Sequence, residues 1–146
     1  MEYLMSLNEV YNERILQLIK TNRCDISNAN LQQIDENIFE FKNITELILN
    51  DNLLTQIPNS IDKLENLTWL VLSDNKLLTL PKTIGNLEKL QGLYLSGNNL
   101  SKLPSSITKL KNLQWLSLLD NPHLVLSKTQ EKWLHNLSKN NCNIFR

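Results

Sequence analysis

The hexapeptide Leu47-Ile-Leu-Asn-Asp-Asn52 decides the fold, because the chain repeats it three more times. The later copies are Leu70-Val-Leu-Ser-Asp-Asn75, Leu93-Tyr-Leu-Ser-Gly-Asn98 and Leu116-Ser-Leu-Leu-Asp-Asn121. The first leucines, at positions 47, 70, 93 and 116, are 23 residues apart each time, and so are the closing asparagines. The segments between the copies keep the same register, as in Ile57-Pro58, Leu80-Pro81 and Leu103-Pro104. Four copies at one fixed spacing predict an array of stacked repeats.

Each copy predicts a short strand followed by a turn. In Leu-x-Leu the two apolar side chains point to one face of the strand, and the residues around them point to the other. The asparagine follows where the chain leaves the strand, and its amide can bond backbone groups of the turn and of the neighbouring coil. The proline then fixes φ, and apolar residues at helical spacing predict a short helical or 3₁₀ return. Stacked units bury their apolar faces together and form a parallel sheet with strands about 4.8 Å apart.

The repeats resemble those of leucine-rich repeat proteins, whose pattern L-x-x-L-x-L-x-x-N-x-L is met at nearly every position. The resemblance implies an α/β fold. It is a right-handed leucine-rich repeat solenoid with a parallel β-sheet on the concave face, short helical or 3₁₀ returns on the convex face and helical caps at both ends. The direct repeats cover residues 24–126, and we expect all of residues 1–146 to form a single domain.

The N-terminal end is expected to cap the first coil. Residues 1–23 form this cap, and apolar residues three or four positions apart predict a helix over 3–20. A helix that covers the open end of the solenoid is preferred to one that binds a partner or a membrane, because its acidic residues disfavour anionic lipid. Residues 24–46 are a degenerate first repeat, in which Ala29 stands in place of the asparagine and Asp35 in place of the proline.

The C-terminal end, residues 127–146, is expected to be the second cap. A helix over 127–138 with Ser127 as its N-cap precedes a last strand at Cys142-Asn-Ile144, which repeats the alternation of Cys24-Asp-Ile26. Such endings resemble the C-terminal caps of some bacterial leucine-rich repeat proteins. Cys24 and Cys142 would lie about five strand spacings apart, beyond the roughly 7 Å reach of a disulfide. We therefore expect buried, reduced thiols.

Composition and motifs exclude several classes of function. Lys plus Arg number 15, as do Asp plus Glu, so no basic field indicates nucleic acid or an anionic membrane. No apolar run is long enough to span a bilayer, and no secretory signal is recognisable. A cytoplasmic location is expected, with export by a non-classical bacterial system as the alternative. No catalytic, metal-ligating or phosphate-binding constellation is present, so we expect no cofactor, no metal and no enzymatic activity.

Strand alternation places three residues of every repeat on the outer, concave face of the sheet. The first row is Arg23, Glu46, Trp69, Gly92 and Trp115; the second is Asp25, Ile48, Val71, Tyr94 and Ser117; the third is Ser27, Asn50, Ser73, Ser96 and Leu119. A solvated face has no physical need for the aromatic and aliphatic members of these rows. The two indoles flank Gly92, which predicts a slot about two strand spacings wide with Tyr94 on its floor or rim.

An acidic row accompanies the aromatic residues, at Asp51, Asp74 and Asp120 with Gly97 interrupting it. Aspartates at such positions either bond backbone amides of the turn or contact a partner, and the sequence leaves both readings open. If they are exposed, the face has an aromatic centre and a negative edge, which suits a partner with a large apolar anchor near Lys or Arg.

These patterns predict a non-catalytic protein–protein interaction module. The candidate partner-binding residues are Trp69, Tyr94, Trp115, Ile48, Val71, Leu119, Glu46, Asp51, Asp74 and Asp120. The expected partner is a protein of unknown identity, with no nucleic acid and no membrane. A monomer is expected, and a homodimer through the concave face is the alternative. The alternative function is an exported microbial effector that uses the same face on a host protein.

Overall fold

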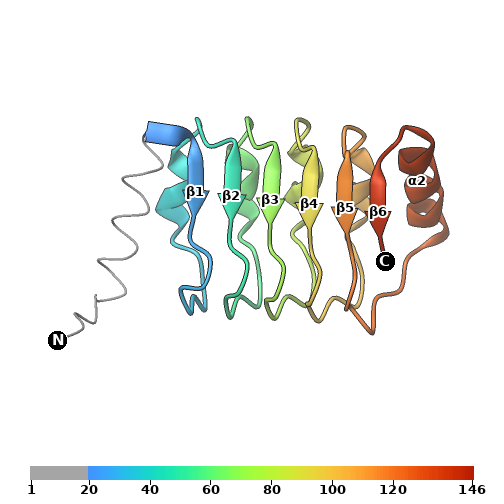
Figure 1. Ribbon diagram of the computed structural model, residues 1–146, viewed down its shortest axis with the longest axis horizontal. Coiled ribbons are helices and arrows are strands. Elements are labelled where there is room, and N and C mark those ends of the chain that lie inside the picture. The colour runs from blue at the N-terminus through green and yellow to red at the C-terminus, as the bar shows by residue number, and fades with distance from the viewer. Residues whose placement is uncertain (1–19) are drawn as a thin grey trace.

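The computed structural model describes residues 20–146 as a stack of coils (Figure 1). Six short strands form one parallel sheet in chain order: β1 Arg23–Asp25, β2 Glu46–Ile48, β3 Trp69–Val71, β4 Gly92–Tyr94, β5 Trp115–Ser117 and β6 Asn143–Phe145. The returns are four 3₁₀ helices: η1 Glu36–Glu40, η2 Asn59–Lys63, η3 Lys82–Asn86 and η4 Ser105–Lys109. The α-helix α2, Lys128–Lys139, lies between β5 and β6 in the sequence. The predicted sheet with 3₁₀ returns is confirmed.

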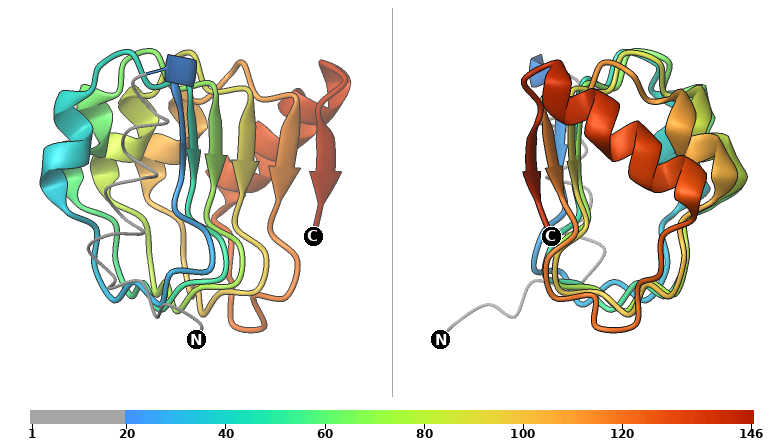
Figure 2. Two further views of the ribbon diagram at one scale, coloured as in Figure 1. Left: turned by 60° about the vertical axis from the view of Figure 1, so that its left-hand side comes forward. Right: turned by 90° about the vertical axis from the view of Figure 1, so that its right-hand side faces the viewer.

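The repeat period sets the register of the sheet. Leu47 pairs with Leu70, Leu70 with Leu93, and Leu93 with Leu116, so equivalent residues form rows across the strands. Viewed end-on, the sheet forms one wall of each coil and the 3₁₀ helices form the opposite wall (Figure 2). The repeat leucines fill the space between the walls, and Leu70 and Leu93 are fully buried there. The core is therefore continuous along the stack, as expected for a solenoid.

The repeat prolines begin the 3₁₀ helices. Pro58, Pro81 and Pro104 are the N-caps of η2, η3 and η4, with φ between −61° and −66°. In the degenerate first repeat Asp35 adopts the same conformation, with φ of −69°, and its carboxylate accepts a hydrogen bond from the Asn37 amide at 3.0 Å. A side-chain cap thus replaces the proline, and the return η1 still forms.

A ladder of buried asparagines joins the coils. The Asn98 side-chain amide donates to the carbonyls of Leu72 and Leu95, each at 3.0 Å, and its Oδ1 accepts from the Leu77 amide at 3.0 Å. Equivalent bonds are made by Asn52, Asn75 and Asn121. The predicted bonding of turn and neighbouring coil is confirmed. At the first coil, which has Ala29 instead, the Ala29 amide donates to Asn52.

The predicted C-terminal helix is confirmed as α2, which ends one residue later than expected. Ser127 and Gln130 form a capping box, in which each side chain accepts a hydrogen bond from the other residue's backbone amide. The helix lies across the end of the last coil (Figure 2), where the Trp133 indole donates to the Leu110 carbonyl at 2.9 Å. The predicted helix over 3–20 lies outside the described residues except for its final residue.

The register of the last strand differs from the expectation. Ile144, rather than Cys142, pairs with Leu116 and occupies the place of the first leucine of a repeat. Cys142 precedes the strand and packs into the end of the core, so the match to Cys24-Asp-Ile26 is wrong by two residues. The expected thiol state is confirmed, because Cys24 and Cys142 are both buried and neither forms a disulfide. None of the helices between residues 20 and 146 is both long and apolar enough to cross a membrane.

Candidate interaction surface

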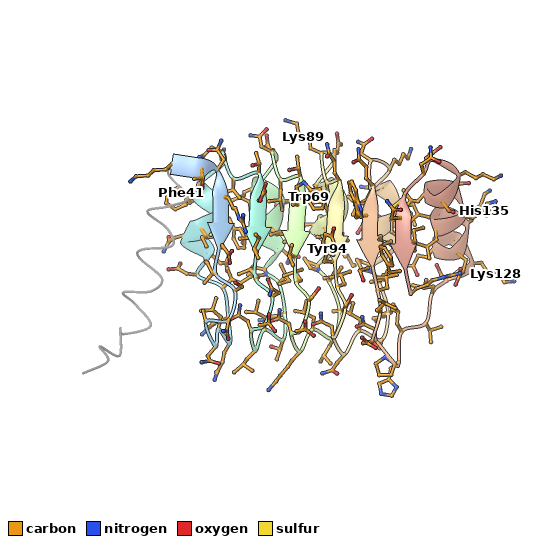
Figure 3. The ribbon with its side chains drawn as sticks, in the orientation of Figure 1. Phe41, Trp69, Lys89, Tyr94, Lys128 and His135 are labelled. Carbon is orange, nitrogen blue, oxygen red and sulfur yellow. The ribbon has the colours of Figure 1, made fainter. Side chains whose placement is uncertain are left out.

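The outer side of the sheet, here called the sheet face, carries the predicted rows of side chains. Trp69 and Trp115 are half-buried on this face, and the leucines that follow them in each strand are fully buried on the other. Figure 3 looks onto the sheet face, with Trp69 and Tyr94 over neighbouring strands. The alternation that separates the indoles from the core is therefore confirmed.

Three of these side chains form an aromatic cluster: Trp69, Tyr94 and Trp115. The ring centroids of Trp69 and Tyr94 are 5.9 Å apart with an interplanar angle of 19°, and those of Trp69 and Trp115 are 5.2 Å apart with an angle of 36°. The Trp69 indole lies over Gly92, where any Cβ would collide with ring atoms Cε3 and Cζ3. The predicted open slot between the two indoles is wrong, because the missing side chain at Gly92 lets the Trp69 ring occupy that space itself.

The cluster presents a preassembled surface. Each offset-stacked or tilted aromatic pair contributes about 0.5–1.5 kcal/mol beyond burial, so the rings restrict one another before any partner arrives. Burial raises the pKa of the Tyr94 phenol above its ordinary value, which already keeps the hydroxyl protonated at neutral pH. No side chain or backbone group in residues 20–146 hydrogen-bonds to this hydroxyl, which leaves it available as a donor and an acceptor.

Aliphatic and aromatic side chains surround the cluster. Ile48 and Val71 are half-buried, and Leu119 is 42% exposed. Phe145 is 49% exposed and extends the row of Tyr94 and Ser117, because β6 pairs Phe145 with Ser117. The sequence reading missed Phe145. Aligning Ile144, instead of Cys142, with the first repeat leucine would have placed it on this face.

The acidic row follows the turns at one edge of the sheet face, and its composition has a conformational cause. Asp51, Asp74 and Asp120 have φ of 55°, 54° and 53°, and Gly97 has φ of 65°. Asn28 occupies the same place in the first coil with φ of 50°. Gly, Asn and Asp are the residues that tolerate this left-handed conformation best. The turns therefore explain why Asp, Asn or Gly stands at this place, and the three aspartates are exposed.

The carboxylates of the row do not bond the turn amides. Asp51 accepts a hydrogen bond from the neighbouring Asn50 side chain at 2.5 Å. Among the described residues, the carboxylates of Asp74 and Asp120 make no hydrogen bond or ion pair. Glu46 differs, because its carboxylate lies 3.6 Å from the Arg23 guanidinium.

Comparison with known families agrees with the repeats. The family model described as "Leucine-rich repeat region" matches residues 60–139, and a second, "Leucine rich repeat", matches residues 22–77. The chain belongs to the leucine-rich repeat family. No curated protein sequence matches the chain significantly.

Solved structures of other leucine-rich repeat proteins share the fold. A leucine-rich repeat protein of Leptospira interrogans is 39% identical, with a TM-score of 0.67; the match covers 79% of this chain and 28% of that one. The ectodomain of the receptor kinase SOBIR1 from Arabidopsis thaliana is 26% identical, with a TM-score of 0.67, over 84% of this chain and 67% of that one. A chain of the BIR3–SERK2 complex from Arabidopsis thaliana is 33% identical, with a TM-score of 0.61, over 71% and 56%. This leucine-rich repeat chain thus spans about a quarter of the Leptospira protein.

The conformation of the acidic turns gives a direct stability prediction. We expect Asp74→Ala to lower the free energy of unfolding by about 1–2 kcal/mol, because the left-handed conformation is sterically unfavourable for alanine. Asp74→Asn should change it by less than about 0.5 kcal/mol, as is usual for a tolerated surface substitution. Urea titration of both variants checks the difference. Equal losses in the two would show that the carboxylate, and not the backbone conformation, stabilises the turn.

Proposed function

We propose that this chain is a non-catalytic protein-interaction module whose sheet face binds a protein partner around Trp69, Tyr94 and Trp115. The observation that carries the proposal is the aromatic cluster, which stacks on the solvent side of the sheet. The BIR3–SERK2 neighbour was solved as a complex, which supports a protein partner for a leucine-rich repeat fold. The exported-effector alternative would use the same residues, and both it and the cytoplasmic location remain predictions.

The energetics of interfaces support this choice of residues. Trp and Tyr are enriched among the residues that dominate binding, and such anchors lie near the centre of an interface. The stacked rings are already restricted, so binding immobilises fewer side-chain rotamers. Ile48, Val71, Leu119 and Phe145 surround the cluster and would exclude water from it when a partner covers the face.

The combined substitution Trp69→Ala and Trp115→Ala tests the proposal. We expect partner affinity to fall about thirtyfold or more, since each central indole contributes at least about 1 kcal/mol. The free energy of unfolding should fall by only about 1–2 kcal/mol, because both indoles lie outside the core. Affinity capture with quantitative mass spectrometry, followed by urea titration of each variant, measures both effects.

The matched control removes exposed apolar side chains elsewhere. Leu78 and Val125 are exposed and lie outside the rows of the sheet face. The double variant Leu78→Ala, Val125→Ala should keep full partner capture. Loss of capture in this control, with retention in the tryptophan variant, would place the binding site elsewhere. Unfolding of the tryptophan variant would assign both indoles to the core.

A further inference from the structure

We infer that the partner segment on the sheet face is basic, with a lysine or arginine side chain that lies between the Asp74 carboxylate, which covers Gly97, and the turn of Asp120. The inference rests on the proposed function and adds the chemistry of the partner. It combines two features of the face: a negative edge without ion pairs and an aromatic cluster about three residues away along the chain.

The charges of the sheet face do not balance. Its carboxylates are Asp25, Glu46, Asp51, Asp74 and Asp120. Its cation in the repeat rows is Arg23, which is engaged by Asp25 at 3.2 Å and by Glu46 at 3.6 Å. None of the four ion pairs in residues 20–146 includes a carboxylate of the acidic row. A partner that neutralises three exposed carboxylates gains from charge complementarity.

Two basic side chains lie near the acidic row, and neither forms an ion pair with its carboxylates. Lys76 follows Asp74 by two residues, but it lines a separate hollow with Leu53 and Gln56. Arg146, which follows β6, lines one groove with Asp120, but its guanidinium bonds Glu131 of α2 at 2.8 Å and forms no ion pair with Asp120. Within residues 20–146, no ion pair therefore neutralises the carboxylates of the row.

Gly97 determines where the Asp74 carboxylate lies. It has no side chain, and a Cβ built on it would collide with Oδ1 of Asp74. The Asp74 carboxylate therefore leans along the row over Gly97, towards the coil that carries Asp120. Adjacent coils are about 4.8 Å apart, so the turns of Asp74 and Asp120 are separated by about 10 Å with Gly97 between them. The Asp74 carboxylate occupies part of this gap, and an ammonium or guanidinium group between it and the Asp120 turn can make charge-assisted bonds to carboxylate oxygens.

The aromatic cluster lies within reach of the same segment. Tyr94 precedes Gly97 by three residues, which corresponds to about 10 Å of extended backbone. An extended peptide spans this distance in about three residues. A partner segment with an apolar side chain two to four residues from a Lys or Arg would therefore cover the cluster and the gap together.

The same charges disfavour other occupants. In a two-fold dimer through the sheet face, each copy would bring its own unpaired acidic row to the interface. Nucleic acid would bring phosphates to the same carboxylates. A basic segment of a protein is the occupant that the charge favours.

Selection from a displayed library of random peptides tests the inference on the full chain. We expect peptides captured by the wild type to be enriched in Lys and Arg near an apolar residue. Asp74→Asn with Asp120→Asn should weaken the selected peptides by about tenfold, because two charge-assisted contacts become neutral. Asparagine keeps the turn, as Asn28 shows at the same place in the first coil. Raising the salt from about 50 to about 500 mM should weaken the wild type more than this variant.

A control variant removes two negative charges elsewhere on the surface, the same change in charge as in the Asp74 and Asp120 variant. Glu65 and Glu88 are exposed on the segments between the 3₁₀ helices and the strands. Glu65→Gln with Glu88→Gln should leave peptide affinity within about twofold, since distant surface charges are screened. Equal weakening in this control would overturn the inference.

The remaining outcomes separate the inference from the proposed function. Suppose that Trp69→Ala with Trp115→Ala abolishes peptide binding. The inference alone would then be overturned if the selected peptides lack basic residues, or if Asp74→Asn with Asp120→Asn leaves their affinity unchanged. Peptides indifferent to the tryptophan variant, or no captured peptide, would overturn both. A stable dimer by analytical ultracentrifugation that the tryptophan variant disrupts would also overturn the inference, since a second copy would then cover the face.

Discussion

Replacing Asn98 by alanine should lower the free energy of unfolding by about 3 kcal/mol. The Leu77 amide is buried and donates to Oδ1 of Asn98, so alanine leaves this donor without its acceptor, at a cost of about 1–3 kcal/mol. The carbonyls of Leu72 and Leu95 each keep one asparagine donor, from Asn75 and Asn121, and lose the other. These lost bonds add about 1 kcal/mol or more. Urea titration followed by circular dichroism measures the change.

The neighbouring residue provides the control. Asn99 is exposed and, within the described residues, its side chain makes no hydrogen bond, so Asn99→Ala should change the free energy of unfolding by less than about 0.5 kcal/mol. Asn121→Ala should cost less than Asn98→Ala, because Asn121 lines a groove of about 630 Å³ through which water can reach the freed groups. Similar small losses at Asn98 and Asn99 would show that the ladder does not join the coils.

The sequence predicts the fold well because each coil repeats the same local rules. The leucine spacing fixes which side chains enter the core, and the period fixes the register between strands. Ser127 as an N-cap predicts the start of α2 in the same local way. The first coil shows a limit of pattern matching. Asp35 departs from the consensus, yet it reaches the proline conformation through its own side-chain cap.

The sheet face is less predictable, because its geometry depends on side-chain packing across strands. The pattern places Trp69, Gly92 and Trp115 in one row, but it does not say that the Trp69 ring crosses Gly92 to contact Trp115. Side-chain rotamers depend on neighbours that are 23 residues away in sequence. The acidic row is a second case. Aspartate tolerates the left-handed conformation of the turn and also adds a negative charge to the surface. Residue type alone therefore does not show which of these two roles an aspartate has.

The register of the last strand could not be predicted, for a different reason. The repeat is interrupted after Asn121, and the chain passes through α2 before it returns to the sheet. No fixed period then sets the register, so the resemblance between Cys142-Asn-Ile144 and Cys24-Asp-Ile26 was misleading by two residues. Consequently Phe145, which lies on the sheet face, was missed.

Trp133→Ala should be the most destabilising of the tryptophan substitutions, with a loss of about 4 kcal/mol in the free energy of unfolding. Trp133 is 6% exposed and belongs to the hydrophobic core, so its removal leaves a cavity between α2 and the last coil. It also removes the donor to the Leu110 carbonyl. A solenoid needs its end covered, and we therefore expect water to enter the core from this end.

The comparison with Trp115→Ala separates the structural indole from the surface indoles. Trp115 is half-buried on the sheet face, and its loss should cost only about 1 kcal/mol, mainly the contact with Trp69. Trp133→Phe keeps most of the buried ring and loses the hydrogen bond, so an intermediate loss of about 1–2 kcal/mol is expected. Unfolding in urea should be followed by circular dichroism, because each substitution also changes the tryptophan fluorescence. A smaller loss for Trp133→Ala than for Trp115→Ala would mean that α2 does not seal the core and that the sheet-face indoles stabilise the fold.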